Sequence, residues 1–436
     1  MEYDIIIGRD ESTKKKLGDK GLIFLGKTYV KMGQTTSLSN NVYLDVATSH
    51  VILVSGKRGS GKSYSLSVIA EEMANLPKEV NKNISVLLLD TMGIFWSMKY
   101  PNERQSDLLK TWGLRPKGLN VNIFTPTGKF QEYKNKGIPT DFNFSIKPKE
   151  LSSEDWCNVF NIKITDEIGV LIERTITEIK KEKKEFSLDD VINQIKKDKK
   201  SELKTRNATE NRFIATKGWG LFDIKGTEIK DIIKNGQVSV LDVSCYTDWN
   251  IKCLVISILT KKLLQERMDA RKLEEINMIE EGQHYLPINE EKQSMPLVWI
   301  SIDEAHEFLP KNRKTPATDA LIALLREGRQ PGISLILATQ QPGEIHHDVI
   351  TQSDIVLSHR VTAKPDIEAL NSIMQTYLTK DILFYLNNLP TLKGSAIILD
   401  DNSERIYPIR VRPKMSWHGG EAPSSVRIKK KLFDLD

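Results

Sequence analysis

The sequence predicts an α/β protein with a mainly parallel, doubly wound sheet. Three observations favour this fold class: apolar runs of strand length, helical periodicity between them, and a glycine-rich loop that joins one such run to a helix. Strands that helices cover on both faces are almost continuously apolar, and helical connections make neighbouring strands parallel. The candidate core strands lie at residues 50–55, 85–90, 238–244, 297–303 and 333–339.

The first hundred residues divide into two regions. Residues 1–47 hold short β-forming segments between turn signals, such as GLIFLGKTYVKMGQ and NNVYLDV, and we expect a small, reduced barrel-like β element there. Residues 48–100 begin the main domain. The strand at 50–55 enters the glycine-rich loop, residues 64–73 have helical periodicity, and 85–90 form the next strand.

Residues 101–235 are predicted to form a mainly helical lobe that is inserted into the main domain. Helices are expected at 166–183 and 190–199, and Ser187 and Asp190 have the spacing of a capping box. The lysine-rich runs KKEKKE and KKDKK also contain acids, which favours a solvated helix face with ion pairs over a DNA-binding surface.

The second part of the main domain is expected at residues 236–408, where helical stretches at 251–275 and 320–327 separate the remaining core strands. Residues 409–436, which contain IRVRP and WHGG, are expected to form a C-terminal tail that braces the domain. The sequence contains no internal repeat.

The composition limits the class of protein. The 436 residues are 39% hydrophobic, which is enough for a large core, and the three cysteines form no C-x-x-C pair, so neither a disulfide framework nor a structural zinc site is expected. No run approaches the roughly 18 apolar residues of a membrane span, and the first residues lack the pattern of a secretory signal. We therefore expect a soluble, cytoplasmic protein that does not bind a membrane. The net charge of +5 does not by itself indicate nucleic-acid binding.

The glycine-rich loop GKRGSGKS has the pattern of a phosphate-binding loop, with Gly56, Gly61, Lys62 and Ser63 at the defining positions. Its backbone N–H groups can surround phosphate oxygens at a helix N-terminus, Lys62 can bind the β- and γ-phosphates, and the Ser63 hydroxyl can ligate Mg²⁺. The predicted nucleotide-binding residues are Gly56, Lys57, Arg58, Gly59, Ser60, Gly61, Lys62, Ser63 and Tyr64.

Two acids follow the apolar run VWISIDE. Asp303 is expected to bind Mg²⁺ together with Ser63, and Glu304 is expected to act as the general base that polarises the attacking water. Alternatively, both acids could cap the helix that follows them.

Polar residues after another core strand and after a helix complete the candidate site. Gln340 follows Thr339 in ILATQQP and could sense the γ-phosphate or position water, although an ordinary turn is the alternative. Arg326 and Arg329 in LREGRQPG could reach the nucleotide of a neighbouring subunit, or could pair with acids in their own subunit. Because no N/T-K-x-D guanine-reading element is present, ATP is the expected nucleotide.

The order of these motifs resembles the HerA-like branch of the HerA/FtsK superfamily of hexameric DNA-translocating ATPases. The matching segments are VYLDV, HVILVSGKRGSGKS, LLLDTMGIF, VWISIDEAHEFLP, LREGRQPGISLILATQQP and IRVRPKMSWHGG, and they span most of the chain outside the helical lobe.

The resemblance implies a RecA-like motor domain in a hexameric ring around double-stranded DNA, with ATP and Mg²⁺ bound between subunits. Lys62, Ser63, Asp303 and Glu304 would then hydrolyse ATP, Gln340 would sense it, and Arg326 or Arg329 would act in trans. HerA-like proteins in archaea commonly work with a NurA-type nuclease, and related bacterial forms serve in anti-phage defence beside other effectors.

The chain departs from the family pattern at three places. Residues 1–47 are shorter than the usual N-terminal barrel that docks the nuclease, which puts a NurA-like docking mode in question. Ser49 and His50 stand where the family often has an arginine before the strand, and Gln341 replaces the commoner arginine of ATQRP.

The leading functional hypothesis is an ATP-hydrolysing ring motor that translocates on double-stranded DNA in DNA processing, repair or defence. Candidate pore elements are the basic loops at 311–314 and 99–104, and a solvated loop is an equal alternative for the first of them. The second hypothesis is an assembly or effector-recruiting ATPase, or a protein-secretion motor, in which contact with DNA is secondary.

Overall fold

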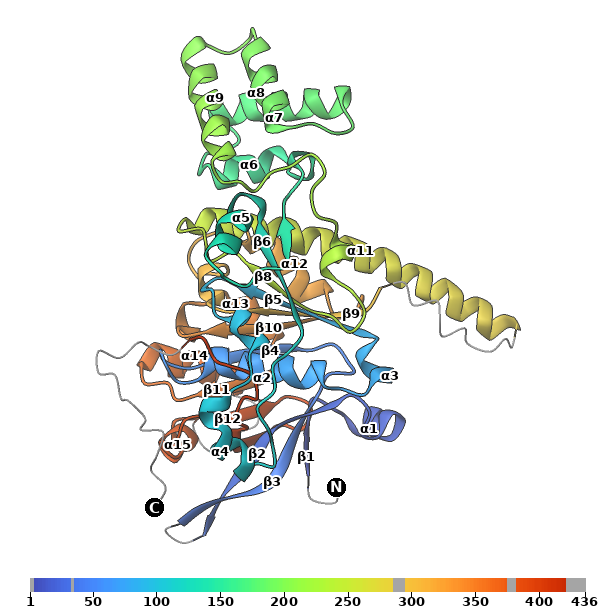
Figure 1. Ribbon diagram of the computed structural model, residues 1–436, viewed down its shortest axis with the longest axis vertical. Helices are drawn as coiled ribbons and strands as arrows, with labels where there is room; N and C mark the ends of the chain where they lie inside the picture. The colour runs from blue at the N-terminus through green and yellow to red at the C-terminus, as the bar shows by residue number, and fades with distance from the viewer. Residues whose placement is uncertain (1–3, 33–34, 285–294, 375–381, 421–436) are drawn as a thin grey trace.

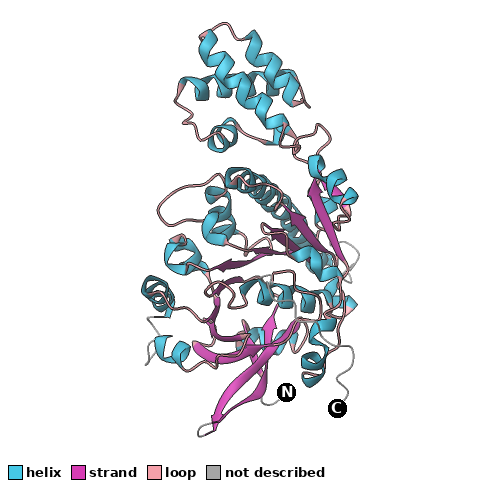
Figure 2. Ribbon diagram, turned by 60° about the vertical axis from the view of Figure 1, so that its left-hand side comes forward, coloured by secondary structure: helices cyan, strands magenta, loops and turns pink. Residues whose placement is uncertain are grey.

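A computed structural model of the chain describes residues 4–32, 35–284, 295–374 and 382–420 (Figure 1). The thirteen strands within these ranges form one mixed sheet in the order β1-β3-β2-β13-β12-β11-β4-β10-β9-β5-β8-β6-β7. Helices cover the middle of the sheet, and a helical lobe stands apart at one end (Figure 2). The predicted α/β class with a mainly parallel core sheet is confirmed.

The five core strands predicted from apolar runs lie next to one another and are parallel. They are β4 (Val51–Ser55), β10 (Ile333–Thr339), β9 (Leu297–Ile302), β5 (Ile84–Asp90) and β8 (Val238–Asp242). Their side chains alternate between two apolar clusters, one on each face: Leu87 and Leu89 belong to one cluster and Leu88 to the other. Burial on both faces explains why these segments are almost continuously apolar.

Helices cover the two faces of these strands. α2 (Lys62–Ala74) contributes Leu66 and Met73 to one cluster, whereas α11 (Trp249–His284) and α12 (Thr318–Glu327) contribute to the other. α11 is longer than the helix expected at 251–275, and its second half projects from the body of the protein (Figure 1).

The N-terminal strands extend the main sheet. β11 (Ile355–His359) is parallel to β4, and then β12 (Ser395–Asp400), β13 (Arg405–Val411), β2 (Leu22–Met32) and β3 (Thr35–Asp45) pair antiparallel in turn, with β1 (Ile5–Ile7) parallel to β3 at the edge. The pairing of Ile409 with Thr28 joins the segment expected to form a separate small element to the ATPase core.

The opposite edge of the sheet is formed by the segment 101–235, for which the sequence predicts a mainly helical insertion. Its strands β6 (Val121–Pro126) and β7 (Phe142–Phe144) continue the parallel sheet beyond β8. The run VNIFTP is short, ends in proline and has no regular alternation, so its strand character depends on burial against β8.

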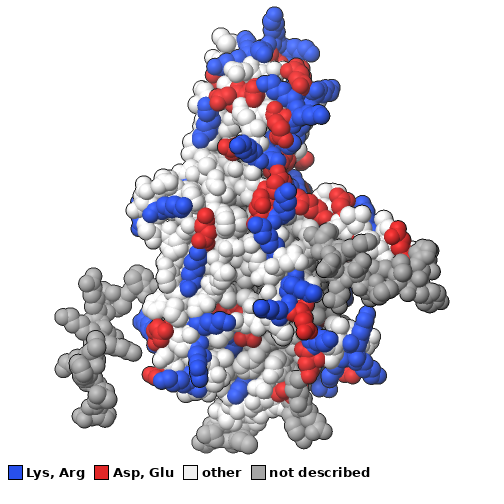
Figure 3. Space-filling model, turned by 45° about the vertical axis from the view of Figure 1, so that its right-hand side comes forward, with Lys and Arg blue, Asp and Glu red and all other residues white. Residues whose placement is uncertain are grey.

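The helices α6 (Ser153–Val159), α7 (Glu167–Glu182), α8 (Leu188–Lys197) and α9 (Leu203–Lys217) form the separate lobe. Ser187 and Asp190 form the predicted capping box at the start of α8. Lysines and acids are interspersed over the lobe (Figure 3), with ion pairs such as Lys183 to Asp190 and Lys149 to Glu185. The surface is therefore a mixed, solvated one, as the alternating runs indicate.

The remaining helices are short. They are α1 (Glu11–Leu17), α3 (Lys78–Asn81), α4 (Ser106–Thr111), α5 (Thr127–Asn135), α10 (Ile229–Ile232), α13 (His347–Gln352), α14 (Lys364–Met374) and α15 (Ile382–Asn387), with 3-10 turns at Phe95–Lys99, Glu103–Gln105, Pro148–Glu150, Ala305–Glu307 and Pro342–Glu344. No helix in the described ranges has the length and apolar character needed to span a membrane. Of the expected tail, residues 421–436 lie outside the described residues.

Candidate nucleotide site

The glycine-rich loop connects β4 to α2 in a conformation that requires glycine. Gly56, Gly59 and Gly61 all have positive φ angles, of 153°, 74° and 117°. A Cβ atom on Gly56 would lie 2.7 Å from the Cβ of His359, so a larger residue does not fit there. The loop therefore ends at the N-terminus of α2, where backbone N–H groups and the helix dipole favour an anion.

The two residues predicted to bind magnesium lie side by side. The Ser63 hydroxyl, in the first turn of α2, donates to Oδ2 of Asp303 at 2.5 Å, and Asp303 is buried just after β9. The buried Lys62 amine donates to the carbonyl oxygen of Lys57 at 3.4 Å. Burial lowers the pKa of Lys62, and the nearby Glu304 and Asp303 carboxylates oppose that shift.

Glu304 is held in an uncommon conformation beside Asp303. Its φ of 54° lies in the left-handed region, and its N–H donates to Oδ1 of Asp303 at 2.9 Å. Its Oε2 is buried and forms no hydrogen bond with any residue that the structure describes; Nδ1 of His306 lies 3.7 Å away. Burial, with the negative charge of Asp303, raises the pKa of Glu304. A carboxylate in this state is suited to accepting a proton.

Gln340 follows β10, which lies between the strand that leads into the glycine-rich loop and the strand that ends at Asp303. The loop, Gln340 and the two acids thus share the carboxyl ends of three neighbouring strands. The preceding Thr339 accepts the N–H of Gln341 at 3.0 Å and lies 3.1 Å from Nδ1 of His306. These contacts fix the backbone from which Gln340 projects.

The two candidate trans arginines differ in their surroundings. Nε of Arg326 donates to Oδ2 of Asp348 in α13 at 2.7 Å, so this guanidinium is paired within its own chain. Arg329, just after α12, is exposed and forms no ion pair with the described part of the chain.

A cleft of about 610 Å³ opens beside the start of α2. Residues 59–64 form one side, and the other side comes from 102–108 and from residues 393–420 around β13 and the tail. The tail residues Arg410, Trp417 and His418 also line the cleft; they belong to the motifs IRVRP and WHGG, but no role for them was predicted.

A second overlooked residue, His359, lies beneath the loop. Its Nε2 is 2.9 Å from the Ser65 hydroxyl, and its Nδ1 is 3.1 Å from the Ser395 carbonyl oxygen, which can only accept. Burial lowers the pKa of His359 to about 4, so the ring is neutral near pH 7. The next residue, Arg360, accepts the N–H of Lys57 at 3.1 Å. The end of β11 therefore supports the loop from inside the protein.

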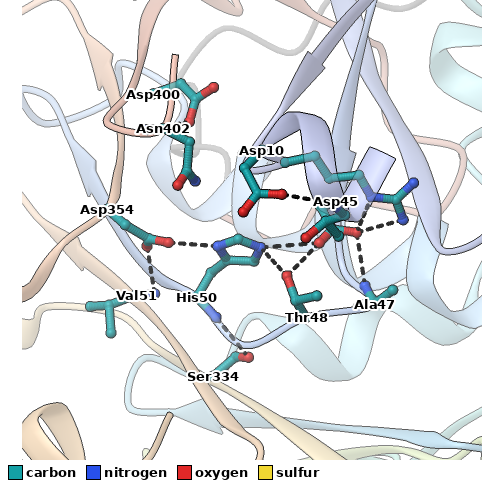
Figure 4. Close-up of polar contacts among 12 residues, drawn as sticks. Asp10, Asp45, Ala47, Thr48, His50, Val51, Ser334, Asp354, Asp400 and Asn402 are labelled. Atoms are coloured by element: carbon teal, nitrogen blue, oxygen red, sulfur yellow. Dashed lines mark hydrogen bonds and ion pairs between the residues drawn. The ribbon is translucent and has the colours of Figure 1, made fainter. Parts of the chain in front are cut away.

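His50, at a position where the chain departs from the HerA pattern, directly precedes β4, at the end away from the loop, and Figure 4 shows its polar contacts. Its Nδ1 is 2.6 Å from Oδ2 of Asp354, and its Nε2 is 3.3 Å from Oδ2 of Asp45, which also pairs with Arg9 at 2.8 Å. Although burial opposes the charged ring, the two carboxylates raise the pKa of His50 to about 9. This cluster connects the N-terminal strands to the core and does not contact the loop.

Residues 29–263, more than half of the chain, match the family model described as "Helicase HerA, central domain", and this match contains the glycine-rich loop. The chain belongs to the HerA family. The resemblance seen in the motifs is confirmed, and the protein is a P-loop ATPase of this family.

Relatives of the HerA family cover most of the chain at low identity. A protein named probable helicase from Methanocaldococcus jannaschii is 22% identical over 97% of the chain and 73% of its own length. The DNA double-strand break repair helicase HerA of Sulfolobus acidocaldarius is 21% identical over 82% of the chain and 63% of its own length. The solved structure of VirB4 from Thermoanaerobacter pseudethanolicus has a TM-score of 0.55, with 14% identity over 90% of this chain and 96% of that one, and supports the fold alone.

Proposed function

We propose that the protein hydrolyses ATP at the carboxyl ends of β4, β10 and β9, and that it uses hydrolysis to move along double-stranded DNA as a ring. The observation that carries the catalytic part is the placement of Glu304 beside the Ser63–Asp303 pair, with its buried Oε2 free of any hydrogen bond to the described residues. A chain in which these acids only capped a helix would not need to keep a buried carboxylate oxygen without a partner.

The oxygen donors of Ser63 and Asp303 fit Mg²⁺, because this ion prefers hydroxyl and carboxylate oxygen ligands. When bound, Mg²⁺ neutralises charge on the phosphate oxygens. The loop N–H groups and the Lys62 amine bind those oxygens, and Gln340 orients the attacking water. Glu304 accepts the proton of that water, for which its raised pKa is appropriate.

The proposals of a ring assembly and of a DNA substrate rest on membership of the HerA family. Relatives named DNA double-strand break repair helicase support DNA as the substrate. The basic loops considered as pore elements give weak support, because Lys99 pairs with Asp141, Arg313 with Glu307 and Lys314 with Asp319. The two pairs in the 311–314 loop are largely exposed, and exposed ion pairs are weak enough to exchange for phosphates, whereas the Lys99–Asp141 pair is half-buried. We propose Arg329 as the arginine that acts in trans, because Arg326 is held by Asp348.

The test is the ATPase rate with and without double-stranded DNA over a series of salt concentrations. We expect DNA to stimulate the rate and the stimulation to fall steeply with salt, since contacts to phosphates release counterions. A rate indifferent to DNA at every salt concentration would support the effector-recruiting or secretion-type alternative and refute the DNA motor.

The matched control in this experiment is Glu304→Gln, which preserves size and removes the base. We expect this variant to bind ATP normally and to lose turnover by about 100-fold or more. Normal hydrolysis by Glu304→Gln would show that Glu304 is not the base.

A further inference from the structure

The cleft beside the glycine-rich loop has a wall that the ATPase motifs do not account for. That wall is the tail, whose Trp417 and His418 line the cleft together with the loop residues. Trp417 leaves 38% of its surface exposed, and His418 contacts the Tyr64 ring edge-on with centroids 5.3 Å apart. Tyr64 directly follows Ser63 in the chain, so the aromatic residues of the cleft adjoin the predicted phosphate-binding residues.

The backbone that carries Trp417 is fixed on both sides. Its N–H donates to the Tyr100 carbonyl oxygen at 2.7 Å, and its own carbonyl oxygen accepts from the Lys414 amine at 2.8 Å and from the Ser97 hydroxyl at 3.2 Å. Because its backbone is already fixed, the exposed indole can bind a flat ligand with little loss of conformational entropy.

A buried carboxylate on α2 anchors the rest of the tail. Glu71, 1% exposed, accepts hydrogen bonds from Arg412 at 3.0 Å, from the Met415 N–H at 3.0 Å and from the Ser416 N–H at 2.7 Å. Tyr64 accepts the Lys414 N–H at 2.5 Å and donates to Gln105 at 3.2 Å. The helix that begins at the phosphate site therefore also positions the opposite wall of the cleft.

We propose that this cleft binds the base and ribose of a purine nucleoside triphosphate, with the base stacked on Trp417. Its volume of about 610 Å³ lies within the range of small-molecule sites, and residues 59–63 line the cleft and belong to the phosphate loop. Lys393 and Arg410 add cations to the lining of the cleft, which suits an anionic ligand. The purine ring is the part of the ligand with the largest face for stacking.

This inference rests on the proposed function only because it takes ATP as the nucleotide. Binding measurements test it, and they do not require that the protein hydrolyse ATP. We would measure the affinities of Trp417→Ala and the unchanged protein for ATP and for inorganic tripolyphosphate, together with KM and kcat. We expect the dissociation constant and KM for ATP to rise about tenfold, as for the loss of one stacked base. The affinity for tripolyphosphate and the kcat at saturating ATP should stay within about twofold, because the phosphate site is intact.

Two further variants control for a structural effect. Trp417→Phe keeps an aromatic face and should restore most of the ATP affinity. Phe142→Ala removes a comparably exposed aromatic side chain at the far edge of the sheet and should change neither affinity. The proposal would be overturned if Trp417→Ala bound ATP as tightly as the unchanged protein. It would also be overturned if the variant lost affinity for tripolyphosphate by the same factor as for ATP. If the protein binds ATP through Trp417 without hydrolysing it, the cleft assignment stands and the proposed function fails.

Discussion

The neutral imidazole of His359 serves as both donor and acceptor beneath the glycine-rich loop. Its Nδ1–H reaches the Ser395 carbonyl oxygen, and its Nε2 accepts from the Ser65 hydroxyl. Because the ring is completely buried, removing it leaves both partners without a replacement from water. The loop above it then loses the surface against which Gly56 packs.

We predict that His359→Ala lowers the free energy of unfolding by about 2 kcal/mol and raises KM for ATP more than it lowers kcat. His359→Gln, whose amide oxygen can accept from Ser65, should recover part of the affinity for ATP. Thermal unfolding measures the stability of the variant, and steady-state ATPase kinetics measure its KM and kcat. A variant that lost stability but kept the same KM would show that the ring supports the core and not the loop.

Individual candidate residues could be located where they belong to a short motif. Lys62, Ser63, Asp303 and Glu304 each follow an apolar strand in a motif with defined spacing, and the structure places them together beyond the carboxyl ends of central strands. The role of His359 could not be predicted, because it depends on contacts with Gly56 and Ser65, about three hundred positions away in the chain. The different surroundings of the two arginines also required the structure, since Asp348 pairs with Arg326 alone.

At the scale of elements, His50 joins the start of β4 to the N-terminal strands. The ring faces the carboxylates of Asp45 and Asp354; Arg9 pairs with Asp45, and Asp400 lies nearby. Its folded pKa of about 9 lies above the unfolded value of 6.5, so it contributes its full stability below about pH 6.5. That contribution is lost as the pH rises through 9.

We therefore predict that His50→Gln is less stable than the unchanged protein by about 2 kcal/mol at pH 6, and that the difference shrinks towards pH 10. Denaturant unfolding of both proteins over this pH range measures it. Lys183→Gln removes one exposed ion pair in the lobe and should give a small difference that is the same at pH 6 and pH 9. A difference for His50→Gln that did not vary with pH would mean that the ring is uncharged in the folded protein.

The elements that could be predicted are those whose character is local. The core strands are continuously apolar, and α8 begins at a capping box, so both can be located from neighbouring residues. β6 and β7 were missed within the expected insertion, because short strands at an edge take their structure from the strand beside them. The N-terminal strands were expected, but their continuity with the main sheet depends on β13, which lies far along the chain.

At the scale of the whole molecule, the exposed Arg329 is accessible to a neighbouring subunit, as the proposed trans role requires. We predict that Lys62→Ala and Arg329→Ala are each inactive as ATPases alone and that mixed assemblies of the two recover part of the activity. In such an assembly some interfaces join an intact loop to an intact arginine. The measurement is the ATPase rate over a series of mixing ratios, with mixing verified by differently tagged subunits.

Arg326→Ala provides the control, because this arginine is exposed and bound to Asp348 of its own chain, and we expect the variant to keep its ATPase activity. If verified mixed assemblies of Lys62→Ala and Arg329→Ala stay inactive at every ratio, Arg329 does not complete a neighbour's site.

The position of β13 between β2 and β12 has a consequence for biosynthesis. Thr28 pairs with Ile409, so the edge of β2 has no partner until roughly 380 more residues have been translated, which takes about 20–80 s at typical rates. During that time the nascent chain presents the open edge of the β2–β3 hairpin, a surface prone to pairing with other strands. Chaperone demand during synthesis should therefore be greatest before the last strand of the sheet leaves the ribosome.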